Sequence, residues 1–247
     1  MEMLDELDFE KLKKLPPKWT QGFSDITNLG FLFNTILEVP SMYCEAVKDY
    51  AITPLYRNLT DAIEILSGKE IIQNSFEKYE EISNKTKPEA SYNLTKNVEW
   101  KNIMEEEEIV IQGRTLGGCL DVIAGLIGTK YDKVSNYIEK YKDDGILWFL
   151  ECYEMTSPEL ERNLWQMKNS NYFEHTKGII FGRPLYIRED YGINFEEAVY
   201  DALKDLNIPV ICGADIGHVP PQLAIVNGAI LKITSKNGKG EVATYLK

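Results

Sequence analysis

Apolar residues recur every three to four positions in several stretches of this chain, and each such stretch predicts a helix with one face packed on a core. The first stretch stops at Pro16-Pro17, a pair that cannot continue a helix. Another begins behind Thr156 and Ser157, residue types that favour a helix start. The pattern predicts helices over residues 4–15, 25–38, 55–66, 119–127, 158–168 and 195–206.

Shorter apolar runs lie between these helices and predict strands. The run 145–151 is almost wholly apolar, as expected for a strand buried on both faces. Near the end of the chain, Asn237-Gly238 separates two alternating runs and predicts a hairpin of strands 229–235 and 241–246. The other predicted strands are 18–22, 41–46, 109–112, 178–181 and 209–212. Alternation of strands and helices indicates an α/β fold.

A polar segment divides the chain. Between residues 67 and 108 the sequence is charged, and it ends in the run Glu105–Glu108, which we interpret as a solvated face. We therefore predict a parallel α/β domain over residues 1–85, a linker over 86–108, and a second α/β domain with a mixed sheet over 109–247.

Composition narrows the function. The 247 residues carry a net charge of −12, which argues against a nucleic-acid binder. No apolar run is long enough to span a membrane. The four cysteines form no CxxC pair and sit among apolar neighbours, so we expect buried, reduced thiols and, with no leader pattern, a cytoplasmic protein.

Ser24 is the first candidate for chemistry. It lies between the strand 18–22 and the helix 25–38, where Gly22 leaves room for a sharp turn and the helix start offers free N–H groups. The pattern resembles the nucleophile elbow G-x-S-x-G, with Ile26 in place of the second glycine. Taken alone, the serine is more readily explained as a helix N-cap.

Only two histidines are present to assist a serine. His175 lies in the polar stretch 171–177 and is interpreted as a surface residue. His218 lies in the loop after the strand 209–212, where α/β folds collect functional side chains. A loop histidine bonded to a backbone carbonyl is the competing interpretation.

Glu151 ends the apolar strand 145–151, so its carboxylate lies at a sheet edge beside an apolar interior. A carboxylate there needs a hydrogen-bonding or charged partner. Orienting an imidazole is one such use, and a structural salt bridge is the alternative. The sequence holds no zinc motif and no phosphate-binding glycine motif, so we expect neither a metal nor another cofactor. The glycines of 113–118 are interpreted as packing positions.

These three sites, in this order, resemble the motif blocks of the LD-carboxypeptidase family of serine peptidases, which includes the microcin C immunity proteins. The blocks are residues 22–27, 145–151 and 213–221, and the segment 113–120 is similar to the start of the family's C-terminal domain. The resemblance places the nucleophile on Ser24, the acid on Glu151 and the base on His218, in a site between two domains. It also implies a metal-free cytoplasmic homodimer.

Family members carry a further strand and a Gly-Gly segment upstream, which supplies part of the oxyanion hole. We therefore expect this chain to be truncated, with Asp25 N–H as its one oxyanion donor.

The resemblance implies cleavage before a terminal D-amino acid of a murein tetrapeptide. Two alternatives stay open: hydrolysis of a peptidyl-nucleotide, with Trp100 stacking on the base, and an inactive homologue that only binds peptides.

Overall fold

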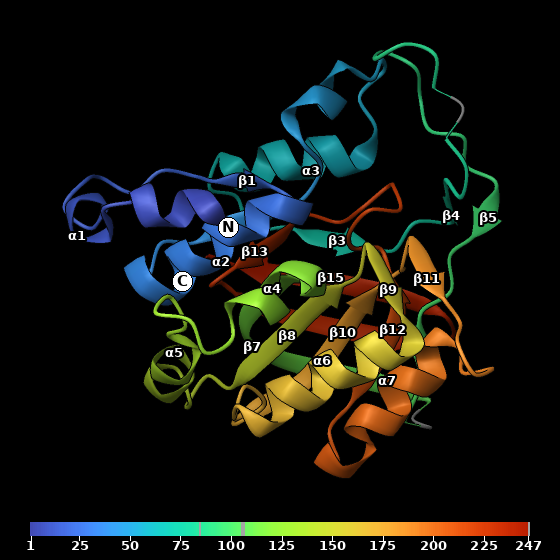
Figure 1. Ribbon diagram of the computed structural model, residues 1–247. Coiled ribbons are helices and arrows are strands. Elements are labelled where there is room, and N and C mark those ends of the chain that lie inside the picture. Colours follow the sequence, from blue (N-terminus) through green and yellow to red (C-terminus); the bar gives the residue numbers. More distant parts are fainter. Residues whose placement is uncertain (84, 105–106, 247) are drawn as a thin grey trace.

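The computed structural model describes residues 1–83, 85–104 and 107–246 (Figure 1). The α-helices are α1 (Phe9–Leu12), α2 (Thr27–Leu32), α3 (Arg57–Leu66), α4 (Leu120–Leu126), α5 (Val134–Lys140), α6 (Ser157–Asn169) and α7 (Phe195–Leu203). Shorter helical turns lie at Glu2–Glu6, Ser24–Ile26, Phe33–Leu37, Val47–Ala51 and Lys204–Leu206. The strands are β1 (Gln21–Gly22), β2 (Ser41–Tyr43), β3 (Ile72–Asn74), β4 (Lys78–Tyr79), β5 (Lys96–Asn97), β6 (Lys101–Asn102), β7 (Glu108–Cys119), β8 (Ile146–Glu151), β9 (Glu154–Thr156), β10 (Thr176–Gly182), β11 (Tyr186–Arg188), β12 (Val210–Ala214), β13 (Ile225–Asn227), β14 (Ile230–Lys236) and β15 (Lys239–Tyr245).

The described residues build one large mixed sheet in the order β3-β15-β14-β7-β8-β10-β12-β6. Its centre, β7, β8, β10 and β12, is parallel, whereas the flanking strands run antiparallel to their neighbours. A smaller sheet has the order β1-β2-β13, with β1 and β2 parallel. The α/β class with a mixed sheet is therefore confirmed.

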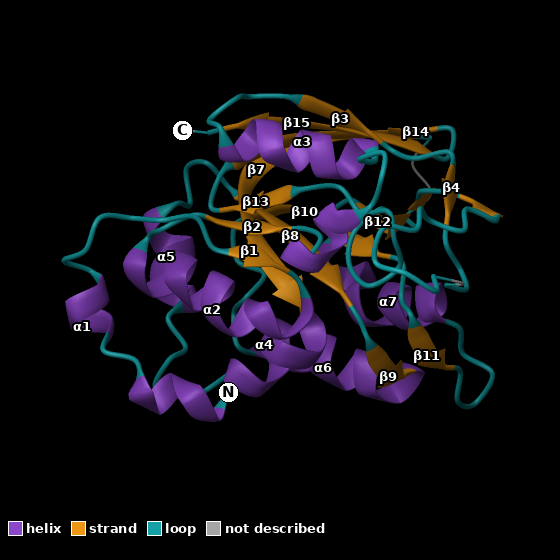
Figure 2. Ribbon diagram, turned by 90° about the horizontal axis from the view of Figure 1, so that it is seen from above, coloured by secondary structure: helices purple, strands orange, loops and turns teal. Residues whose placement is uncertain are grey.

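The central strands are covered on both faces, as the apolar run of β8 predicts. Ile146, Trp148 and Leu150 pack with helices α4 to α7, while Leu147 and Phe149 pack with β2, β13 and α3. Figure 2 shows α3 on one side of the sheet and α4 and α6 on the other. All six residues of β8 are buried.

Strand pairing crosses the predicted domain boundaries. From the first part of the chain, β3 joins one edge of the large sheet, and β6, from the predicted linker, joins the other. In return, β13 joins β2 in the small sheet. These strands have two or three residues each, too few to show an alternating pattern.

The N-terminal helices are shorter than predicted. The stretch 4–15 is divided because Asp8 caps a new helix, α1, with its side chain. The stretch 25–38 passes through three helical forms and ends at Glu38, whose φ is 60°.

Other local predictions are confirmed. Thr156 and Glu159 form a capping box at the start of α6. Asn237 and Gly238 both have positive φ in the β14–β15 turn, as a tight hairpin requires. Gly117 is a packing position, because a Cβ there would lie 1.8 Å from the Phe149 carbonyl oxygen.

The four cysteines are buried and unpaired. In the predicted solvated run, Glu107 and Glu108 are exposed, and Glu105 and Glu106 lie outside the described residues. Across the residues the structure describes, no helix has both the length and the apolarity to cross a lipid bilayer.

Candidate active site

The carboxyl ends of the parallel strands meet at one edge of the large sheet. In the strand register, Cys119 of β7 pairs with Glu151 of β8, and Gly182 of β10 pairs with Ala214 of β12. His218 follows β12 by four residues. The topology therefore brings the second and third predicted residues to the same edge, where α/β proteins place their ligand sites.

Glu151 is fully buried and has a partner for each carboxylate oxygen. His218 Nδ1 lies 2.8 Å from Oε2, and the Tyr43 hydroxyl donates to Oε1. Because a carboxylate only accepts, the Nδ1 atom carries the proton, and in the neutral ring Nε2 is left free to take another. This is the geometry of a general base held by an acid.

His218 is enclosed by aromatic rings. Its ring centroid lies 5.0 Å from that of Phe23, next to the serine, and 4.7 Å from that of Tyr153. Gly217 allows the loop to pass Glu151, since a Cβ there would lie 2.5 Å from Oε2 and the φ of +92° favours glycine. The imidazole side chain is 9% exposed.

Ser24 sits on a strained turn between β1 and the helical turn Ser24–Ile26. Its φ is +61°, a left-handed conformation that costs about 1–3 kcal/mol for a residue with a side chain. Its N–H donates to the Tyr43 hydroxyl at 3.0 Å. The N-cap interpretation does not hold, because Phe23 and Ile26 occupy the cap positions and no side chain caps either turn.

The structure brings the three predicted residues together through two neighbours. Tyr43 bonds both the Ser24 backbone and Glu151, and Phe23 packs on His218. Within the described part of the chain, the Ser24 hydroxyl makes no hydrogen bond. In these residues His218 bonds to Glu151 and makes no hydrogen bond to the Ser24 hydroxyl.

Asp25 N–H is predicted to be an oxyanion donor. It follows Ser24 at the start of the helical turn, where backbone N–H groups have no partner inside the helix. Among residues 1–83, 85–104 and 107–246, none accepts a hydrogen bond from Asp25 N–H.

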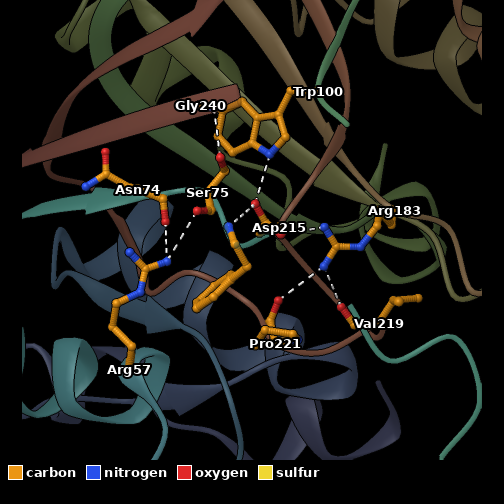
Figure 3. Close-up of polar contacts among 10 residues, drawn as sticks. Arg57, Asn74, Ser75, Trp100, Arg183, Asp215, Val219, Pro221 and Gly240 are labelled. Carbon is orange, nitrogen blue, oxygen red and sulfur yellow. Dashed lines mark hydrogen bonds and ion pairs between the residues drawn. The ribbon is translucent and has the colours of Figure 1, made fainter. Parts of the chain in front are cut away.

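Trp100 is not part of this site, and the expectation of a stacking ring is corrected. The residue is 2% exposed, and its ring lies against Gly240, where a Cβ would come within 2.1 Å. Its Nε1 donates to Asp215 Oδ2 at 2.9 Å (Figure 3). A ring this buried offers little surface for stacking on a ligand.

Asp215 instead belongs to a buried ion pair that braces the His218 loop. Arg183 Nη1 lies 2.6 Å from Asp215 Oδ1. Its Nη2 donates to the carbonyl oxygens of Val219 at 2.9 Å and Pro221 at 3.1 Å (Figure 3). The Arg183 guanidinium thus contacts the loop before His218, at Asp215, and after it, at Val219 and Pro221.

Removing the charge of Asp215 is expected to destabilise the fold. Asp215→Asn leaves the Arg183 guanidinium buried without a counter-charge and should lower the free energy of unfolding by about 3–5 kcal/mol. Urea denaturation measures the change, with exposed Asp143→Asn as the control. Adding Arg183→Met should cost less than the sum of the two single changes, and simple additivity would contradict the coupling.

Sequence reasoning missed Tyr43 and Arg183. Each lies at the carboxyl end of a strand, β2 and β10 respectively, where a search of strand ends can find it. Their hydrogen-bond partners are distant in the sequence, so no local pattern predicts which residues they contact.

The described residues contain no group of three or more His, Cys, Asp or Glu side chains placed to hold a metal ion. Burial raises the pKa of Cys119 and Cys152, which lie beside Glu151, so both thiols are neutral and weak nucleophiles.

Two family models match the chain. The LD-carboxypeptidase N-terminal domain matches residues 1–44, and the LD-carboxypeptidase C-terminal domain matches residues 112–233. Ser24 lies within the first match, and Glu151 and His218 lie within the second.

Among curated proteins, the chain is similar to a protein of Bacillus subtilis named as a murein peptide carboxypeptidase, with 23% identity over 121 residues. That match covers 48% of this chain and 35% of the relative, so the matched part spans about a third of the relative's length.

Solved structures show the same fold. One is a MccF-like protein from Bacillus anthracis, with a TM-score of 0.76 and 22% identity. Another is a muramoyltetrapeptide carboxypeptidase from Oxalobacter formigenes, with a TM-score of 0.70 and 21% identity. Each comparison covers 98% of this chain and 72% of the other.

Proposed function

Because the chain belongs to the LD-carboxypeptidase family, we propose that it is a serine-type carboxypeptidase that hydrolyses the amide bond before a terminal D-amino acid of a murein peptide. The observation that carries the proposal is the hydrogen-bonded chain from Ser24 N–H through Tyr43 to Glu151 and His218. A homodimer that works in the cytoplasm, as the sequence resemblance implies, is part of the same proposal.

The reaction follows from the roles of the three residues. His218 Nε2 takes the Ser24 hydroxyl proton while Oγ attacks the amide carbonyl carbon. The imidazolium, stabilised by Glu151, then protonates the leaving nitrogen, so the D-amino acid departs and the acyl group stays on Oγ. Water, deprotonated by His218, releases the acyl group and restores the serine.

Asp25 N–H supports the charged intermediate. The carbonyl oxygen becomes negative during attack, and the free N–H at the start of the helical turn is available to donate to it. One such donor typically contributes about 10²–10³ in rate.

We propose a murein peptide rather than a peptidyl-nucleotide as the substrate. The similar curated protein is named as a murein peptide carboxypeptidase. The ring expected to stack on a nucleobase, Trp100, is buried and bonded to Asp215.

A burst experiment tests the proposal. The protein is mixed with a murein tetrapeptide, quenched in acid within milliseconds to seconds, and digested for mass spectrometry. We expect released D-alanine and, in the quenched sample, the tripeptide acyl group on the peptide that contains Ser24. An aspartyl-adenylate mimic is run in parallel. Turnover of the mimic alone, an adduct at another residue, or no turnover of either substrate would each contradict the proposal.

A further inference from the structure

Tyr43 occupies the space between the serine turn and the acid of the site. It ends β2, is 4% exposed, and its ring packs on Phe149 of β8 at a centroid distance of 5.5 Å. Its hydroxyl accepts from Ser24 N–H and donates to Glu151 Oε1. A phenol has one proton to donate and lone pairs to accept with, so one oxygen serves both partners.

We propose that Tyr43 is a positioning residue that couples the nucleophile turn, in the N-terminal part of the chain, to the Glu151–His218 pair in the C-terminal part. This inference rests on the proposed function. Residues 24 and 43 lie within one family match and residues 151 and 218 within the other, so the phenol oxygen joins the two parts through the Ser24 backbone and the Glu151 carboxylate.

The first effect of Tyr43 is on the serine. Ser24 holds a left-handed backbone conformation, and the bond from its N–H to the phenol offsets part of the strain. Because Ser24 N–H donates to Tyr43, Asp25 N–H is the amide of the helical turn Ser24–Ile26 that makes no hydrogen bond to the described residues. Tyr43 thereby selects which backbone donor faces the developing oxyanion.

The second effect is on the acid. With Oε1 held by Tyr43, the Glu151 carboxylate presents Oε2 to His218 in one orientation. Besides Tyr43 and His218, the Cys119 and Cys152 thiols lie near this carboxylate, and Asp121 lies near both thiols. Burial and the Glu151 charge raise the pKa of Tyr43 well above its ordinary value, so the phenol keeps the proton that it donates.

Tyr43→Phe tests the coupling, because it removes the hydroxyl and keeps the packed ring. We expect kcat to fall about 10- to 100-fold, with KM within about twofold, as for loss of an interaction that acts on the reacting groups. Tyr50→Phe is the matched control: the Tyr50 hydroxyl also accepts a hydrogen bond, from the Gln21 side chain, and its loss should leave both constants unchanged.

A spectroscopic signal separates positioning from general support. The Nδ1 proton of His218 should give a resonance far downfield, and Tyr43→Phe should move it while the His175 signals stay in place. The chain has two histidines, so assignment is direct. An unchanged resonance together with an unchanged kcat would overturn the inference.

One further measurement keeps this test independent of turnover and of the variant's folding. In the unmodified protein, the Ser24 amide should exchange with deuterium much more slowly than the Asp25 amide, and equal rates would contradict the bond to Tyr43. Should the unmodified protein show no turnover, the proposed function fails, while the imidazole signal and the exchange rates still decide the role of Tyr43.

Discussion

Ser24→Ala is expected to lower kcat by about 10⁴–10⁶-fold, the range for loss of a serine nucleophile whose base remains in place. In the proposed mechanism the variant lacks the hydroxyl that His218 deprotonates, and the neighbouring thiols of Cys119 and Cys152 are buried and neutral. Steady-state release of D-alanine from a murein tetrapeptide measures the change.

The fold should survive this substitution. Within the described residues the Ser24 hydroxyl has no hydrogen-bond partner, so its loss should change the free energy of unfolding by less than about 0.5 kcal/mol. Ser135→Ala, on the exposed side of α5, is the matched control and should retain full activity. A Ser24→Ala rate within tenfold of the unmodified protein would remove Ser24 from the mechanism.

Local signals in the sequence point to the candidate residues of this site. The apolar run of β8 places Glu151 at the end of a buried strand, and the β1–helix junction places Ser24 on a tight turn. His218 is chosen as the candidate base because the only other histidine in the sequence, His175, lies in a polar stretch. Each inference uses a property carried by a few adjacent residues, which is why it can be made without coordinates.

Long-range partners carry no such signal. Trp100 lies in a polar connection, where an aromatic ring suggests a surface for stacking. Instead its ring packs against Gly240, and Asp215, 115 positions away, accepts its N–H. Tyr43 looks like an ordinary strand residue until β8 is placed beside it. The short strands β3, β6 and β13 pair with strands that are distant in the sequence, so their own residues do not predict them.

Glu151→Gln is expected to lower kcat by about 10⁴-fold with little change in volume. A carboxylate accepts from both Tyr43 and His218, whereas an amide has one accepting and one donating end. With the NH₂ group toward His218, the ring must accept at Nδ1 and carry its proton on Nε2, where it cannot act as a base. With the NH₂ group toward Tyr43, the phenol must accept from the amide, and its own proton loses the acceptor that Glu151 provided.

Either orientation of the glutamine also removes the negative charge that stabilises the imidazolium, so substrate binding should be affected far less than kcat. Glu154→Gln is the matched control, since Glu154 is exposed on β9 three residues further along and should tolerate the change. Kinetics of both variants on the tetrapeptide, with the His218 Nδ1 proton followed by NMR, measure the effect. A Glu151→Gln enzyme with a near-normal kcat would show that the His218 tautomer does not depend on this carboxylate, and that the buried acid has only a structural role.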